Sequence, residues 1–200
     1  MPIKITIKYN RFLDPIFIAW IKSQDRFKDW KEPVHEDVLK CVKKYNVLWD
    51  KYGAKIIKGL EKSTGMSFQD EKINIYIVSG NPRPFNNPLI MKSSYAPRDF
   101  LLTLTHELIH CLFTQNNIPL ELTHKLFVHE DKTTSAHIPV YAILKYIFKD
   151  TLKMHYSLSN HSKNIKKTSV NISYRLAMEE VEKLGYKNIL KTIREKVVTK

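Results

Sequence analysis

Two histidines and a glutamate at a fixed spacing are the residues of this sequence best suited to chemistry. They lie in the segment His106-Glu107-Leu108-Ile109-His110, an H-E-x-x-H motif. On an α-helix, positions i and i+4 share one face, so His106 and His110 can both present an imidazole nitrogen to one Zn²⁺ ion. Glu107 follows His106 directly and is close enough to take a proton from an attacking water. Two nitrogen ligands and a nearby carboxylate are what metal-assisted hydrolysis of an amide requires.

The residues around the motif predict a helix that packs against a core. From Phe100 to Gln115 the chain has no Gly or Pro, and Glu107 and the two histidines are its only ionisable residues apart from a cysteine thiol. An apolar stripe with helical spacing would face the core: Leu101, Leu104, Leu108, Cys111 and Leu112. The alternative is a packed helix whose histidines are satisfied core residues and whose glutamate is paired. Buried unpaired charge is costly, and the spacing fits a metal ion, so we favour the metal site.

Residues 103–112, T-L-T-H-E-L-I-H-C-L, resemble the active-site helix of the zincin metallopeptidases. The resemblance implies that His106 and His110 are zinc ligands and that Glu107 is the general base. The metzincin extension of the motif would need Gly at position 113 and His at 116, where this chain has Phe113 and Asn116. The resemblance therefore implies a gluzincin-like enzyme, or a zincin with a distal third ligand, that hydrolyses peptide bonds in peptides or proteins.

The sequence leaves the third metal ligand open between two main candidates. His137 opens the apolar helical segment H-I-P-V-Y-A-I-L-K-Y-I-F, for which residues 133–135 offer N-caps and Pro139 suits a first turn. Glu130 lies twenty residues after His110, a separation that resembles thermolysin. We expect His137 to be the ligand, with Glu130 as the alternative. Further candidates are Glu121, His124, His129, His155, His161, Glu179 and Glu180.

A tyrosine one helical turn after His137 could take part in catalysis. The hydroxyl of Tyr141 could stabilise the oxyanion that forms when water attacks a carbonyl. Tyr95, in the segment that enters the motif helix, is a weaker candidate for this role. Each of the two could also be an ordinary core or rim aromatic.

Length and composition indicate a small globular protein. Its 200 residues, 43% of them hydrophobic, can bury the core of a single domain spanning 1–200. No run of eighteen apolar residues occurs, so no membrane span is expected, and the N-terminus lacks the apolar core of a signal peptide. The only cysteines are Cys41 and Cys111, which excludes a disulfide framework. A cytoplasmic location is the default expectation.

The formal net charge of +13 suggests a second class of function. A strongly basic protein can bind nucleic acid or an acidic partner through long-range electrostatics. The lysines are dispersed, however, with no run of five basic residues and no nucleic-acid module signature. The alternative to a peptidase is therefore a nucleic-acid- or partner-binding regulator in which the zincin-like core is structural or latent. The sequence makes no prediction about oligomeric state.

The pattern of elements predicts an α+β fold that is mostly helical, with a small sheet beside the motif helix. The first part, 1–98, contains an alternating strand near the N-terminus, a helix that starts at Asp14, and a long amphipathic helix over 34–61. Residues 73–78 are its clearest strand. The resemblance to zincins implies that this strand forms the sheet edge along which extended substrate lies, and the alternative is an ordinary strand of the core sheet. The turn-rich segment 81–98 is expected to be a loop that borders the substrate.

The remaining chain is predicted to be helical. Residues 99–156 contain the metal-binding helices, and residues 157–200 contain a polar loop followed by two helices, over about 170–184 and 187–198. Gly185 separates these last two helices.

Overall fold

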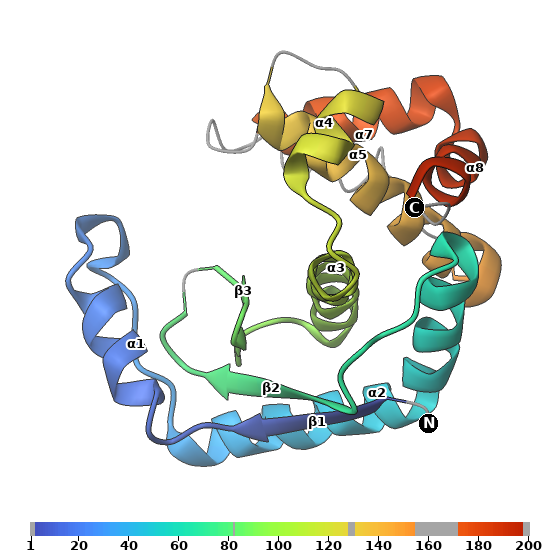
Figure 1. Cartoon of the computed structure of the whole chain (residues 1–200). Coiled ribbons are helices and arrows are strands. Elements are labelled where there is room, and N and C mark those ends of the chain that lie inside the picture. The colour runs from blue at the N-terminus through green and yellow to red at the C-terminus, as the bar shows by residue number, and fades with distance from the viewer. Residues whose placement is uncertain (1–2, 82, 128–130, 155–171, 198–200) are drawn as a thin grey trace. The chain divides into compact units, whose positions relative to one another are not determined.

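A computed structural model describes residues 3–81, 83–127, 131–154 and 172–197 (Figure 1). The chain divides into two compact units, one made of residues 1–53 and 70–111 and the other of residues 54–69 and 112–200. Two long helices, α2 (His35–Thr64) and α3 (Pro97–Gln115), contribute residues to both units. The single-domain organisation inferred from the sequence stays a prediction.

The first unit contains a four-stranded mixed sheet in the order β1-β2-β4-β3. Its strands are β1 (Lys4–Tyr9), β2 (Lys72–Val78), β3 (Phe85–Asn86) and β4 (Leu89–Lys92). β1 and β4 both run parallel to β2, whereas β3 pairs antiparallel with β4. Ile73, Ile75 and Ile77 of β2 are buried, as their alternation along the strand predicts.

The prediction that 73–78 forms the sheet edge is wrong, because β2 lies inside the sheet with β1 on one side and β4 on the other. Alternating isoleucines report which face of a strand is buried and carry no information about its neighbours. The second partner, β4, and the edge strand β3 come from the segment 81–98, which was predicted to be a loop. Leu89, Ile90 and Met91 of β4 are buried in the sheet.

The short helix α1 (Asp14–Lys22) begins at the residue that the sequence predicted, and a 3₁₀ turn η1 (Asp25–Phe27) follows it. Asp14 is buried, and its carboxylate accepts three hydrogen bonds. The donors are the backbone N–H of Ser79 at 2.5 Å, the Ser79 hydroxyl at 2.8 Å and the Tyr9 hydroxyl at 2.7 Å. Together with burial, this carboxylate raises the pKa of Tyr9 to about 12. Asp14 thereby ties the start of α1 to the end of β2.

Tyr45 of α2 holds the segment that leads into α3. Its ring stacks on Phe100, with the ring centroids 3.7 Å apart and the planes 1° from parallel. Its hydroxyl donates to the backbone carbonyl oxygens of Ser93, at 2.6 Å, and Tyr95, at 2.8 Å. Because Tyr45 is buried, these contacts fix the first turn of α3 and the residues before it.

The predicted core stripe of the motif helix is confirmed: Leu101, Leu104, Leu108, Cys111 and Leu112 are all buried. α3 also lies beside the edge strand, since the Cys111 thiol is 3.4 Å from the carbonyl oxygen of Asn86 in β3. The expected placement of a small sheet beside this helix is therefore observed within the first unit (Figure 1).

The second unit is helical. Its elements are α4 (Leu120–Leu126), α5 (Lys132–Lys145), a π-helical turn η2 (Tyr146–Thr151), α7 (Ile172–Leu184) and α8 (Tyr186–Val197). α5 is its centre: it is buried from Thr134 to Leu144 and contacts α4, α7 and α8. Gly185, with φ of +79°, joins α7 to α8, as predicted.

α5 begins earlier than its sequence suggests. Its N-cap is Asp131, whose carboxylate accepts from the backbone N–H groups of Thr133 and Thr134. Caps at residues 133–135 and a first-turn position for Pro139 were expected, but Pro139 lies inside the helix. Asp131 caps the helix in place of residues 133–135 because its carboxylate satisfies two backbone N–H groups at once.

The α+β fold class with a predominance of helix is confirmed. Among the residues that the structure describes, no helix is long and apolar enough to cross a membrane.

Candidate metal centre

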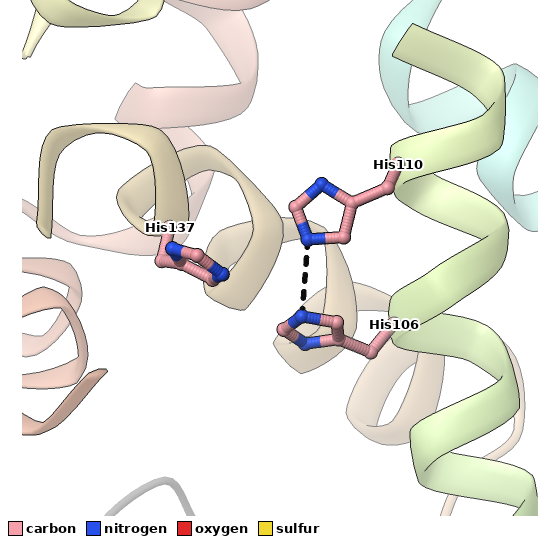
Figure 2. Close-up of side chains that lie close together, drawn as sticks. All are labelled: His106, His110 and His137. Atoms are coloured by element: carbon pink, nitrogen blue, oxygen red, sulfur yellow. Dashed lines mark hydrogen bonds between the residues drawn. The ribbon is translucent and has the colours of Figure 1, made fainter. Parts of the chain in front are cut away.

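His106 and His110 form a close pair on α3. Figure 2 shows both side chains extending from the same side of the helix, with their Nε2 atoms 3.1 Å apart. Two imidazoles that ligate one tetrahedral Zn²⁺ at about 2.05 Å place their nitrogens about 3.3 Å apart. The observed separation is close to that value. The i, i+4 spacing therefore places the two imidazoles side by side on one face of the helix, as predicted.

Glu107 is the buried carboxylate of the motif, with only 8% of its surface exposed. Burial raises its pKa to about 7. The Tyr95 phenol and the Cys111 thiol are close enough to interact electrostatically with it. Glu107 is not part of the predicted apolar stripe of the helix, yet its side chain is buried as well.

His137 lies on α5 and is also buried. Its Nδ1 is 2.7 Å from the backbone carbonyl oxygen of Thr133, one turn earlier in the same helix. Burial lowers the pKa of this imidazole, and the bond to Thr133 opposes that shift. A carbonyl can only accept, so Nδ1 carries the proton and Nε2 carries the lone pair that a metal ion needs.

A nitrogen atom from each of His106, His110 and His137 lies within 4.8 Å of the other two (Figure 2). Among the residues that the structure describes, this is the group of histidine, cysteine or acidic side chains that could hold a metal ion. His137, the expected third ligand, belongs to this group, and its role as a ligand stays a prediction.

The other predicted ligands are placed elsewhere or are not described. Nδ1 of His124 is 3.0 Å from the Ser135 hydroxyl. Glu179 and Glu180 form ion pairs within α7, with Arg175 and Lys183 respectively. The side chain of Glu121 is not described, and Glu130, His129, His155 and His161 lie outside the described residues.

Tyr141, predicted to be catalytic, is a buried residue beside His137, with ring centroids 6.2 Å apart. A second tyrosine that the sequence analysis did not single out is closer: the ring of Tyr174 on α7 is 4.5 Å from that of His137. Tyr174 also contacts Tyr141 edge-on. No local pattern marks Tyr174, because its contact with His137 depends on how α7 packs against α5. The catalytic role of Tyr141 stays a prediction.

The weaker tyrosine candidate, Tyr95, lies in the first unit with the histidine pair. It is half-buried, bonds to the Thr103 side chain, and its pKa is raised to about 12, chiefly by burial and next by Glu107. Its position is set by Tyr45, which binds its backbone carbonyl oxygen.

Comparisons with known proteins identify no relative of this chain. The sequence matches no protein-family model, and neither curated proteins nor solved structures give a match.

Proposed function

We propose that this protein is a zinc-dependent hydrolase that cleaves peptide bonds. The observation that carries the proposal is the pair of Nε2 atoms of His106 and His110, 3.1 Å apart on one helix, with a carboxylate between them in the sequence. The resemblance of residues 103–112 to the zincin active-site helix supports the same reaction class.

The donor set fits zinc. Three imidazoles, from His106, His110 and His137, are a common ligand set for catalytic zinc, and they leave a fourth position open. Nitrogen-rich sites of this kind suit Zn²⁺ better than Mg²⁺ or Ca²⁺, which prefer oxygen ligands. When bound, the ion would supply Lewis acidity that polarises the scissile carbonyl and makes water a better nucleophile.

The chain's own residues supply the proton transfer and the orientation of the ligands. Glu107 accepts a proton from the attacking water and delivers it to the leaving amine. The carbonyl of Thr133 holds the His137 ring in the tautomer that presents Nε2. Either Tyr95 or Tyr141 donates a hydrogen bond to the oxyanion. Tyr95→Phe and Tyr141→Phe distinguish the two residues, because only loss of the donating hydroxyl should lower kcat.

The test is hydrolysis of a quenched fluorescent peptide library by zinc-loaded protein, compared with Glu107→Gln. We expect the variant to bind zinc like the wild type and to lose at least about a hundredfold in kcat, since general acid–base catalysis contributes roughly 10²–10⁴-fold. The matched control is Glu61→Gln, a half-buried glutamate on α2. Full activity in Glu107→Gln, or activity that a chelator does not remove, would overturn the mechanism.

A further inference from the structure

The second unit contains a cavity that belongs to no part of the proposed metal centre. Its volume is about 280 Å³, and it is lined by residues from three elements. α2 supplies Lys62 and Ser63, the π-helical turn η2 supplies Tyr146 and Asp150, and α8 supplies Lys187, Leu190 and Arg194. All three elements lie within one compact unit, so the cavity is a local feature of that unit.

The wall between α2 and η2 is tightly packed. A Cβ atom added at Gly59 would lie 2.6 Å from Cδ1 of Ile147 and 3.1 Å from the Thr151 side chain, so a larger residue there would require the Ile147 side chain to shift. Gly59 and Ile147 are buried. A π-helical turn is a costly irregularity in a helix, and such turns are frequent at functional sites. Here the turn carries Tyr146 and Asp150 into the cavity lining.

Within the part of the chain that the structure describes, the cations of the cavity have no ion-pair partner, whereas several nearby lysines do. Neighbouring lysines form ion pairs: Lys145 with Glu182, Lys183 with Glu180, and Lys191 with Glu195. Among the described residues, Lys62, Lys187 and Arg194 have no carboxylate partner within 4.0 Å. Lys187 and Arg194 are seven residues apart on α8, which places them on one face of the helix. Three cations and one carboxylate leave the lining with a formal charge of +2 (3 − 1).

The single carboxylate is held in place. Asp150 accepts a hydrogen bond from the Tyr186 hydroxyl at 2.9 Å, which occupies its Oδ2 atom. Its other oxygen can accept a hydroxyl from a ligand. Tyr146 and Leu190 add aromatic and apolar surface. The cavity thus combines an excess of unpaired cations with one carboxylate acceptor and a small apolar area.

From this combination we infer a binding site for a small phosphomonoester that carries hydroxyl groups, such as a sugar phosphate or a mononucleotide. Lys62, Lys187 and Arg194 contact the phosphate, and Asp150 accepts from a sugar hydroxyl. The volume of about 280 Å³ lies just below the usual range of small-molecule sites, about 300–1,000 Å³, so only a small ligand fits. The inference does not depend on the proposed peptidase activity.

The test is isothermal titration calorimetry of the full chain with ribose 5-phosphate, AMP, adenosine and inorganic phosphate. We expect saturable binding of ribose 5-phosphate or AMP, at least about tenfold tighter than inorganic phosphate, and no binding of adenosine. Arg194→Gln and Lys187→Gln should each weaken binding about tenfold, the loss expected for one charge-assisted hydrogen bond. The control is Lys191→Gln, which removes the same charge from α8 at a lysine paired with Glu195. It should leave binding unchanged.

Asp150→Asn distinguishes a specific site from general attraction of anions, because it should change the affinities for two phosphate ligands in opposite directions. The change removes a negative charge and one carboxylate oxygen that can accept from a hydroxyl. It should therefore lower the affinity for ribose 5-phosphate and raise the affinity for inorganic phosphate. Equal losses in Arg194→Gln and Lys191→Gln, equal affinity for AMP and inorganic phosphate, or no saturable binding would each overturn the inference. A chelator should leave binding unchanged, which separates this cavity from a phosphate bound at the histidines. Circular dichroism verifies that each variant is folded.

Discussion

The imidazole Nδ1 of His137 lies 2.7 Å from the backbone carbonyl oxygen of Thr133, one turn earlier in α5. Thr133 lies in the first turn of α5, and its carbonyl oxygen has two lone pairs, so it can accept from a side chain as well as from the backbone. The bond to Thr133 orients the ring and selects the neutral tautomer with its lone pair on Nε2. This is the orientation that a metal-ligating histidine receives from a backbone partner in many metal sites.

We predict that His137→Ala loses zinc. Removal of a direct ligand should weaken zinc affinity by more than about a hundredfold, because loss of an outer partner alone typically costs 10- to 100-fold. Competition with a chromophoric chelator measures the affinity. His124→Ala is the control, since that histidine lies on α4 and contacts Ser135. Unchanged affinity in a folded His137→Ala protein would remove His137 from the site and return Glu130 to consideration.

Asp131 should stabilise α5 in a pH-dependent manner. Hydrogen bonds from Ser173, Thr134 and Thr133 lower its pKa to about 2, below the unfolded value of about 3.9. The ionised cap therefore contributes stability above about pH 4, and this contribution disappears as the pH falls towards 2. Asp131→Ala should cost about 1 kcal/mol at neutral pH, the usual value of an N-cap.

The measurement for Asp131 is urea unfolding of the wild type and Asp131→Ala between about pH 6 and pH 2.5. The difference between the two proteins should narrow as the pH falls. A constant difference across this range would show that the charge on Asp131 has no part in capping α5.

Tyr45→Phe should separate the two ways in which Tyr45 holds the entry to α3. The stacking on Phe100 remains, but the hydrogen bonds to the carbonyl oxygens of Ser93 and Tyr95 are lost. We expect a loss of about 1–3 kcal/mol in the free energy of unfolding, since buried acceptors are left without their donor. Tyr52→Phe, a half-buried tyrosine on the same helix, is the control and should change stability little. Equal effects of the two variants would contradict this role for the Tyr45 hydroxyl.

Asp14→Asn should destabilise the first unit. The amide keeps one acceptor oxygen but places an NH₂ group against donors from Ser79 or Tyr9, so at least one buried donor loses its partner. The expected cost is about 1–3 kcal/mol in chemical denaturation. Asp25→Asn changes an exposed aspartate in η1 and serves as the control. A stable Asp14→Asn protein would mean that the carboxylate network adds nothing beyond packing.

Much of the helical architecture was predictable from the sequence because helices are local structures. The motif helix, its buried stripe and the stacked pair of His106 and His110 all follow from a period of 3.6 residues. The break at Gly185 was predictable for the same reason, since a positive φ is a property of one residue. For the expected third ligand, residue type, spacing and the resemblance to zincins left two main candidates, His137 and Glu130.

Only the tertiary structure decided the features that depend on residues far apart in the chain. β2 became an inner strand because β1 and β4 pair with it from opposite sides, and no pattern within 73–78 encodes its neighbours. The contact of Tyr174 with His137 and the hold of Tyr45 on Tyr95 likewise join residues of different elements. By itself, the sequence determined the residues that could do chemistry and the helix that presents two of them, because both follow from local periodicity. The residues that surround them in space are set by packing between distant parts of the chain, which a local pattern does not specify.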